Sequence, residues 1–430
     1  MTPKTERPNV VWIGPRAADA AMLSGSLRPV AIFSADAAER GMTDPVTRSL
    51  EMRTGLRRRW GAASVADVVA TFASEIQEAA RRSVAVVPYA MDRALQELVG
   101  EVRSGLVGPT WELQMWLDDK RHALRVFDDA RVRRLPYRIM SAKQLSTLAL
   151  SRRTADRFVV QIPRASGGKG TYFVSAAATE LADLASRLDT TDVLVSDYRK
   201  ESYSLNVHLA VMQRDVLVSP MSVQLIGIPE CSLHPAAYCG NDFAAMQDIP
   251  GEVIARAQEA TTRVGTMLAN LGYQGVAGLD LLVIRETNEL FPVDLNPRFQ
   301  ASTKALAEAE RAAGADPGFV DLVGGVAVGI YGRDEVARYV APRALPIVQL
   351  VFYHRSVTAV HRRRGRDDSD GHTTGTVGGW FLTGLALPGV RVCGGAVLAT
   401  ATGPSGEYAS PESAAKALNG TVEAFYEHAA

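Results

Sequence analysis

Hydrophobic and polar positions alternate along the first hundred residues in a way that predicts strands and helices in turn. The apolar run Asn9–Gly14 ends in glycine, and Pro29–Phe33 has the same shape, as buried strands do. Between Ser64 and Arg82 apolar residues recur at helical spacing, and Ser83–Pro88 follows as another apolar run. This alternation predicts an α/β layer around a parallel sheet.

The rest of the chain divides at changes of pattern. A charged helix is expected to begin at Asp118 and to end before Pro136, and an amphipathic helix is expected over Pro411–Glu427. The polar, glycine-containing run Arg362–Gly371 is typical of a solvated loop. With 430 residues the chain exceeds what one core usually organises, so we expect three domains, 1–116, 117–335 and 336–430.

Composition and charge exclude several classes of protein. Lys plus Arg and Asp plus Glu both number 47, so no overall positive field favours nucleic acid. The longest apolar stretches are much shorter than the ~20 residues that span a bilayer, so no membrane association and a cytoplasmic location are expected. Cys231, Cys239 and Cys393 include no CxxC pair, which favours reduced thiols over disulfides or a zinc site.

A loop of small residues between two apolar runs, within Asp156–Val174, carries the first chemical signal. Ser166-Gly-Gly-Lys169-Gly170 lets backbone N–H groups approach an anion, and Lys169 adds positive charge, so a triphosphate is a natural ligand. It is not a Walker loop, because G-x-x-x-x-G-K-[ST] is absent, and a plain flexible turn is the alternative. Gly14 alone is a weak sign of nucleotide binding, since G-x-G-x-x-G is also missing.

A second hairpin, Gly278–Arg298, places acids inside apolar strands. The strand period of two puts Asp294, Asn296 and Arg298 on one face, and hairpin pairing brings Asp280 beside Asp294. Two carboxylates and an amide oxygen suit Mg²⁺ that is also bound to phosphate, with Mn²⁺ as an alternative. An exposed hairpin with incidental acids is the competing interpretation, but unpaired charges in apolar strands are costly.

Together, the glycine-rich hairpin with its lysine, the interval of about 110 residues, and the Asp…Asp-x-Asn-x-Arg ending resemble the ATP-grasp superfamily over Asp118–Tyr331. The resemblance implies an α/β (α+β) ATP-grasp fold, with an N-terminal α/β pre-ATP-grasp domain and a small C-terminal domain that closes over the site. It also implies ATP and Mg²⁺ as cofactors.

Carried over residue by residue, the resemblance implies roles for individual side chains. Lys120 would reach the nucleotide phosphate, and Ser166–Gly170 would cover the β- and γ-phosphates. Catalytic roles fall to Lys169, which neutralises phosphate charge, and to Arg298, which stabilises the acyl phosphate. Asp280, Asp294 and Asn296 would hold the metal ions. The remaining nucleotide contacts would come from Gln161, Ser166, Gly167, Gly168, Gly170, Ser196, Asp197, Arg199 and Ser202.

Two positions depart from the family pattern. Gln161 stands where many members have a lysine, so it can donate a hydrogen bond but brings no charge. Asp294 stands where many have glutamate, which keeps the carboxylate on a shorter arm. Gln161 therefore leaves the nucleotide affinity or the exact pose open.

Within the superfamily, the layout and Gln161-x-x-x-x-Ser166-Gly-Gly-Lys-Gly-Thr171 are similar to peptide ligases of the type found in pheganomycin biosynthesis. This implies a ligase that joins a small carboxylic acid to an amine in natural-product biosynthesis, one substrate being a non-proteinogenic amino acid. A glutamate–amino acid ligase and a non-catalytic ATP-binding module are the alternatives. A carboxylase or phosphotransferase is a further rival, although no biotinyl Met-Lys motif occurs. A homodimer is compatible with the resemblance.

Two further segments are candidates for the site. Small residues in Gly371–Gly379 could cover it, although a plain surface loop is the simpler interpretation. His234 and Tyr238–Asn241 could line an acceptor pocket, and each has a structural alternative. The sequence supplies no Ser/His/Asp or Cys/His set in recognisable context, so no covalent enzyme intermediate is expected.

Overall fold

The protein was analysed as a computed structural model. It describes residues 6–36, 45–59, 61, 64–102, 105–150, 157–165, 167–188, 192–213, 215–363 and 375–428. Within these ranges, helices long and apolar enough to cross a membrane are absent. Ser166 and most of the predicted loop over Arg362–Gly371 lie outside the described residues.

The N-terminal segment forms the parallel sheet that its apolar pattern predicts. The order is β3-β2-β1-β5-β6 and every pairing is parallel. The predicted runs correspond to β1, β2, α2 and β5, so the prediction of an α/β layer is confirmed. The elements are β1 (Asn9–Gly14), β2 (Arg28–Ser34), β3 (Thr47–Ser49), β5 (Ala85–Pro88), β6 (Gly105–Leu106), the 3₁₀ helix η1 (Ala17–Gly25), α1 (Leu50–Thr54), α2 (Ser64–Arg81) and α3 (Arg93–Gly100).

The charged helix begins later than predicted. Asp119 is the N-cap of α5 (Lys120–Asp129), because its side chain accepts a hydrogen bond from the Arg121 backbone N–H. A separate short helix, α4 (Trp111–Leu117), precedes it.

The glycine-rich hairpin belongs to a small antiparallel sheet of order β7-β10-β8-β9. Helix α6 and the 3₁₀ helix η3 belong to the same lobe, and apolar side chains between them and the sheet form a core of its own. The elements are β7 (Arg138–Ser141), η3 (Ala142–Leu150), β8 (Arg157–Gln161), β9 (Thr171–Ser175), α6 (Ala178–Leu188) and β10 (Asp192–Asp197).

A nine-stranded antiparallel sheet of order β15-β14-β11-β12-β13-β16-β21-β19-β18 crosses the rest of the molecule. The C-terminal strands therefore extend the sheet that carries the second predicted hairpin. Its strands are β11 (Ser202–Met212), β12 (Asp215–Ile226), β13 (Tyr238–Asp242), β14 (Gly275–Ile284), β15 (Leu290–Asn296), β16 (Ile347–Tyr353), β18 (Gly375–Val377), β19 (Trp380–Thr383) and β21 (Val397–Pro404). The helices of this part are η4 (Ala244–Gln247), α7 (Gly251–Asn270), α8 (Thr303–Ala312), α9 (Phe319–Ala327), α10 (Arg333–Arg338) and α11 (Pro411–Ala424).

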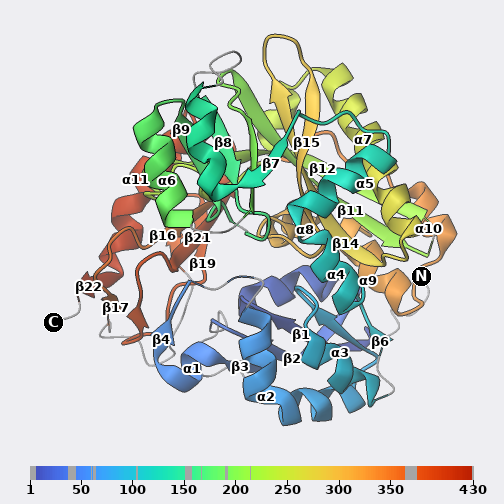
Figure 1. Cartoon of the computed structure of the whole chain (residues 1–430). Helices are drawn as coiled ribbons and strands as arrows, with labels where there is room; N and C mark the ends of the chain where they lie inside the picture. The colour runs from blue at the N-terminus through green and yellow to red at the C-terminus, as the bar shows by residue number, and fades with distance from the viewer. Residues whose placement is uncertain are drawn as a thin grey trace.

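A fourth small sheet joins the two ends of the chain. Its order is β22-β17-β20-β4, and β4 (Leu56–Arg57) pairs in parallel with β20 (Arg391–Val392). Figure 1 shows β4, in blue, beside the red C-terminal segments. The other strands are β17 (Val360–Arg362) and β22 (Tyr426–His428). Through β4, the N-terminal segment is therefore hydrogen-bonded to the C-terminal part of the chain.

The last predicted helix is three residues too long. Helix α11 ends at Ala424, and Tyr426 turns inward, where its hydroxyl donates to the Leu398 carbonyl at 2.6 Å. The described part of the predicted covering segment, Gly375–Gly379, forms β18 and the turn into β19, and the Gly379 N–H donates to Glu407. The division into three domains stays a proposal.

Candidate functional site

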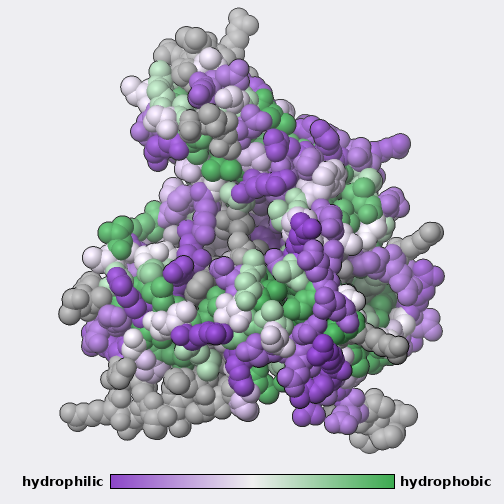
Figure 2. Space-filling view, turned by 60° about the horizontal axis from the view of Figure 1, so that its bottom comes forward, coloured by the Kyte–Doolittle hydropathy of each residue, from purple (hydrophilic) through white to green (hydrophobic). Residues whose placement is uncertain are grey.

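A cavity of about 680 Å³ opens where the hairpin lobe, the nine-stranded sheet and the N-terminal sheet meet. This volume falls within the range of roughly 300–1,000 Å³ typical of small-molecule sites. The face shown in Figure 2 is hollowed beneath a projecting lobe, with hydrophilic residues around the hollow. The predicted site residues on the cavity wall are Gln161, Gly167, Gly168, Lys169, Ser196, Asp197, Arg199, Ser202, Asp280, Asp294, Asn296 and Arg298.

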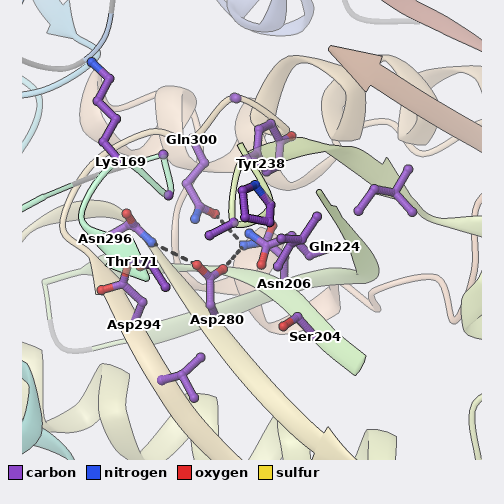
Figure 3. A pocket seen from close by; sticks show the side chains of 18 of the residues that line it. Lys169, Thr171, Ser204, Asn206, Gln224, Tyr238, Asp280, Asp294, Asn296 and Gln300 are labelled. Atoms are coloured by element: carbon purple, nitrogen blue, oxygen red, sulfur yellow. Dashed lines mark hydrogen bonds between the residues drawn. The ribbon is translucent and has the colours of Figure 1, made fainter. Parts of the chain in front are cut away.

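The two acids of the second hairpin lie side by side, as the strand period predicts. Asp280 and Asp294 are direct partners in the β14–β15 pairing. Asn206 Nδ2, from β11, donates to Asp280 Oδ1 at 2.7 Å, and Asn296 Nδ2 lies 3.4 Å from Asp280 Oδ2 (Figure 3). Burial, and then the charge of Asp294, raise the pKa of Asp280 to about 6. A cation placed between these carboxylates would offset both effects.

These residues fit a magnesium ion. Mg²⁺ takes oxygen ligands and usually completes its shell with phosphate and water, so two carboxylates and an amide are a sufficient protein contribution. Three or more His, Cys, Asp or Glu side chains do not come together anywhere in the part of the chain that the structure describes. The metal-binding roles of Asp280, Asp294 and Asn296 stay a prediction.

Arg298 is held beside these acids with part of its guanidinium unpaired. Its Nη1 donates to Asn296 Oδ1 at 2.7 Å and lies 4.0 Å from Asp118. Its Nε is buried and has no hydrogen-bond partner among the described atoms. A buried, incompletely paired cation beside two carboxylates is suited to an anionic ligand.

Lys120 lies behind the wall rather than on it. Its Nζ forms an ion pair with Asp294 Oδ1 at 2.8 Å and donates to the Ala165 carbonyl at 3.2 Å. Lys120 therefore connects the start of the glycine-rich loop to the carboxylate pair. A contact of this lysine with phosphate stays a prediction.

The glycine-rich loop packs against the loop before β13. Gly167 and Gly168 have φ of 62° and 77°, which favours glycine at both positions. A Cβ on Gly168 would lie 1.9 Å from the Ala236 carbonyl oxygen, so the close approach also requires glycine. Gly170 is buried and off the cavity wall, where its carbonyl accepts from the Ile162 N–H.

Lys169 extends away from the carboxylate pair (Figure 3). Partial burial, and then the nearby charge of Arg59, lower the pKa of Lys169. Arg59 Nη2 itself donates to the Gly167 carbonyl at 3.2 Å. The loop thus contacts the N-terminal segment through Arg59 as well as the loop before β13 through Ala236.

The residues expected around adenine and ribose share one end of the cavity. Ser196 and Asp197 end β10, and the Ser202 hydroxyl, at the start of β11, donates to the Arg199 carbonyl at 2.6 Å. Gln161 Nε2 lies 3.5 Å from the Thr171 hydroxyl. Apolar side chains beside them could pack on a flat base, namely Leu135, Tyr137, Val159, Phe173 and Leu282. The nucleotide contacts themselves stay a prediction.

Several residues that line the cavity were not predicted from the sequence. Arg16 and Tyr89 follow β1 and β5, at the carboxyl ends of parallel strands, where ligands bind in open α/β sheets, and that position was an available signal. Arg59 carried no such signal. Asn206, Gln224 and Gln300 also line the cavity and surround Asp280. Tyr238, considered for an acceptor pocket, is on the wall, whereas His234 is not.

Comparisons with known proteins bear on the family and the fold. Residues 117–302 match a family described as the ATP-grasp domain. Carboxyaminoimidazole ribonucleotide synthase from Aspergillus clavatus, solved with ATP, is 13% identical, with a TM-score of 0.62 over 97% of this chain and 99% of that one. Phosphoribosylamine–glycine ligase from Thermotoga maritima is 15% identical, with a TM-score of 0.58 over 98% and 97%.

A third similar structure contains bound ligands. The biotin carboxylase domain dimer of Hydrogenobacter thermophilus 2-oxoglutarate carboxylase, with MgADP, ADP and bicarbonate, is 12% identical, with a TM-score of 0.60 over 99% of this chain and 91% of that one. At these identities the likeness establishes the fold, and the predicted ATP-grasp fold is confirmed. A search of curated protein sequences gives no match.

Proposed function

We propose that this protein is an ATP-dependent ligase that activates a carboxylate as an acyl phosphate and joins it to an amine, because residues 117–302 match the ATP-grasp domain family. The observation that carries the proposal is the convergence on one cavity of Asp280, Asp294, Asn296 and Arg298 with a glycine-rich loop bearing Lys169. This is the set of charges that phosphoryl transfer to a carboxylate requires.

The protein's contribution is positioning and charge. A carboxylate oxygen attacks the γ-phosphorus of ATP, the bond to the β-phosphate oxygen breaks, and ADP leaves with the bonding electrons. Bound Mg²⁺ would draw negative charge from the phosphate oxygens. Asp280 and Asp294 hold that cation in this proposal, while Arg298 offsets the charge on the acyl phosphate.

The second half of the reaction forms the amide. The amine lone pair attacks the acyl carbon, inorganic phosphate departs, and the nitrogen loses a proton. Arg298 stabilises the oxyanion of the tetrahedral intermediate, and Gly167–Lys169 exclude water while the acyl phosphate exists. Holding both substrates in one cavity supplies most of the rate in this scheme.

We assign the substrates to peptide-like natural-product biosynthesis, with a non-proteinogenic amino acid joined to an amino acid or peptide. This finer assignment rests on the likeness of the Gln161–Thr171 motif and of the three-part layout to peptide ligases of that kind. A glutamate–amino acid ligase uses the same chemistry. A non-catalytic ATP-binding module would have no need of Arg298 beside the acids.

A second candidate is a carboxylase that activates bicarbonate. The similar structures favour it, since one of them binds bicarbonate with MgADP and another is a carboxyaminoimidazole ribonucleotide synthase. Bicarbonate is a small carboxylate that Arg298 would accept in the same position.

The test is phosphate release from ATP and Mg²⁺ with panels of amino acids and with bicarbonate, the products being identified by mass. We expect amide, ADP and phosphate, and a loss of about 10³-fold in kcat for Asp294→Asn. Glu286→Gln removes an exposed carboxylate from the turn of the same hairpin and should leave kcat unchanged. A carboxylated product that forms only with bicarbonate would favour the carboxylase. ATP binding without any turnover would favour the non-catalytic module.

A further inference from the structure

The N-terminal segment places three arginines on the cavity wall, and their charges are balanced differently. Arg57 forms a buried ion pair with Glu51 at 2.6 Å, and Arg16 pairs with Asp19 at 2.8 Å. Arg59 pairs with no carboxylate among the described residues. It donates to the Gly167 carbonyl and lies over the Tyr353 ring, 5.5 Å from guanidinium carbon to ring centroid. Arg59 is therefore a wall cation whose charge the described protein does not offset.

Two other basic groups accompany Arg59. Burial, and then the charge of Arg59, lower the pKa of both Lys169 and His234. Arg59 contacts Gly167, and Gly168 packs against Ala236 in the loop after β12. The three segments that carry Arg59, Lys169 and His234 therefore meet on this side of the cavity. Such an arrangement costs free energy unless an anion joins it.

An apolar surface continues from Arg59 into the cavity. Tyr353 and Val351 lie two residues apart on β16 and so point to the same face, and Val397 on β21 is the direct partner of Tyr353. All three line the cavity, and a Cβ on Gly395 would lie 3.7 Å from the Arg59 Cδ. A ligand here meets a cation at the rim and aliphatic and aromatic side chains beneath it.

Arg59 is separate from the reacting centre. In the part of the chain that the structure describes, Arg59 has no hydrogen bond or ion pair with Asp280, Asp294 or Arg298, which surround the carboxylate that would be phosphorylated. Lys169, on the loop that Arg59 contacts, extends away from the carboxylate pair (Figure 3). The anion that Arg59 holds is therefore a different one from that carboxylate.

Resting on the ligase function proposed above, we infer that Arg59 binds the unreacted carboxylate of the amine substrate, which is an α-amino acid with an apolar or aromatic side chain. Its side chain packs on Val351, Tyr353 and Val397. Its amino group forms the new C–N bond to the acyl carbon as phosphate leaves, and its carboxylate remains free in the product. Guanidinium binds carboxylate through two parallel hydrogen bonds, a geometry that an ammonium cannot reproduce.

The same cation could instead contact a phosphate of ATP, because Lys169 is its neighbour. The experiment separates these two sources of negative charge. Isothermal titration calorimetry would measure binding of leucine, phenylalanine and their amides to the full chain with a non-hydrolysable ATP analogue and Mg²⁺. Binding of the analogue itself is measured separately. The variants are Arg59→Gln, Arg59→Lys and, as a matched control, Arg58→Gln at the exposed neighbouring arginine.

The expected result is a preference of the wild type for the free amino acid over its amide of about 30-fold or more. Arg59→Gln should reduce that preference to a few-fold and Arg59→Lys should restore it in part. The affinity for the ATP analogue should change less than the preference does, through the lost hydrogen bond to the Gly167 carbonyl. Arg58→Gln should match the wild type. The inference is overturned if the preference survives in Arg59→Gln, if the wild type shows none, or if Arg59→Gln weakens the analogue instead.

Failure of the ligase function has a different signature. In that case no acid and amine pair would stimulate phosphate release, while the preference for a carboxylate and its dependence on Arg59 would remain measurable. The carboxylate subsite would then stand without the amide-forming reaction.

Discussion

The two walls of the cavity are built in different ways. One wall comes from the β8–β9 and β14–β15 hairpins, in which residues close in sequence pair across a turn. The opposite wall is assembled from Arg16, Arg57 and Arg59 of the N-terminal segment and from Tyr353 of β16. Hundreds of residues separate the N-terminal segment from β16. The first wall carries the Asp280–Asp294 pair together with Lys169, and the second carries three arginines with Tyr353. The residues that we propose for phosphoryl transfer are therefore close together in sequence, whereas the proposed carboxylate subsite depends on how distant segments dock.

This contrast implies that substitutions on the two walls should affect different properties, turnover on one wall and stability on the other. Changes on the wall formed by the two hairpins, the hairpin wall, should reduce turnover more than stability, because its charged groups are held by side chains that can move. Changes on the opposite wall, assembled from distant segments and called the docked wall, should reduce stability more than turnover, because its charged groups hold elements together. The predictions follow from the largest expected effect to the smallest.

Replacement of Arg57 by methionine should cost the most stability. Arg57 is 1% exposed and its ion-pair partner Glu51 is fully buried. Its guanidinium also donates to the Gly384, Leu385 and Val397 carbonyls of the C-terminal part. Arg57→Met removes the counter-ion of the buried Glu51, which then keeps the hydrogen bond from the Leu387 N–H, so the free energy of unfolding should fall by about 3 to 5 kcal/mol. Urea unfolding followed by tryptophan fluorescence measures it.

The control for this change is Arg58→Met, which alters an exposed neighbour in the same strand region and should change stability by less than about 0.5 kcal/mol. A loss for Arg57→Met no larger than that of the control would show that β4 docks without this ion pair. The contrast between the walls would then fail.

On the hairpin wall, Gly278→Ala should reduce turnover while stability changes little. A Cβ at Gly278 would lie 2.0 Å from the side-chain amide of Gln300, which can swing aside. Gln300 accepts from Asn206 Nδ2 at 3.1 Å, and Asn206 holds Asp280. Displacing Gln300 and Asn206 would reorient the carboxylate of Asp280, so kcat for phosphate release should fall by about 10- to 100-fold.

Gly420→Ala is the matched control for Gly278→Ala. Gly420 is an exposed position of α11 where a Cβ meets open space. We expect unchanged kcat and a gain of about 0.5 to 1 kcal/mol in stability, because alanine is the better helix former. Equal kcat for Gly278→Ala and the wild type would mean that the orientation of Asp280 does not depend on Gln300.

The difference between the walls also explains what the sequence could predict. Strand periodicity and a short turn suffice to place Asp280 opposite Asp294, because both lie in one hairpin. The same logic located β1, β5 and the glycine-rich loop. The predicted bounds were wrong at two helix ends, where Asp119 caps α5 and Tyr426 turns into the core.

The docked wall was not predictable by these means. Arg59 reaches the cavity because β4 pairs with β20 more than 300 residues further along the chain. A two-residue strand has no periodicity, and an arginine in a run of three looks like a solvated surface. Lys120 shows the same limit, since its ion pair with Asp294 depends on two elements far apart in sequence.

On the docked wall, Asp36→Asn should make stability less dependent on pH. Burial, and then the charges of Arg57 and Glu51, set the pKa of Asp36, which rises from 3.8 to about 7. The folded protein therefore binds this proton more tightly than the unfolded chain, and the stability that Asp36 contributes is lost as pH rises through the range from 4 to 7. Asparagine keeps the hydrogen bond from the Ala17 N–H and removes the charge.

The size of this effect follows from the pKa. A change from 3.8 to about 7 corresponds to at most about 4 kcal/mol, and the nearby Arg57 offsets part of it. We expect Asp36→Asn to be about 2 kcal/mol more stable than the wild type at pH 8 and equal to it at pH 4. Thermal unfolding of both proteins at matched pH values measures the difference. A constant difference at all pH values would rule out titration of Asp36 as its cause.

The smallest expected effect is at the contact between the two walls, where the glycine-rich loop lies on the loop before β13. In Gly168→Ala, the new Cβ collides with the Ala236 backbone carbonyl, which cannot swing aside as a glutamine can. The loop should then sit away from the cavity, raising the KM for ATP by about 10-fold with little change in global stability. Gly167→Ala is the control, because it shares the positive φ but meets only the Arg59 guanidinium at 4.0 Å. If both variants raise KM equally, backbone strain rather than contact between the walls governs the loop.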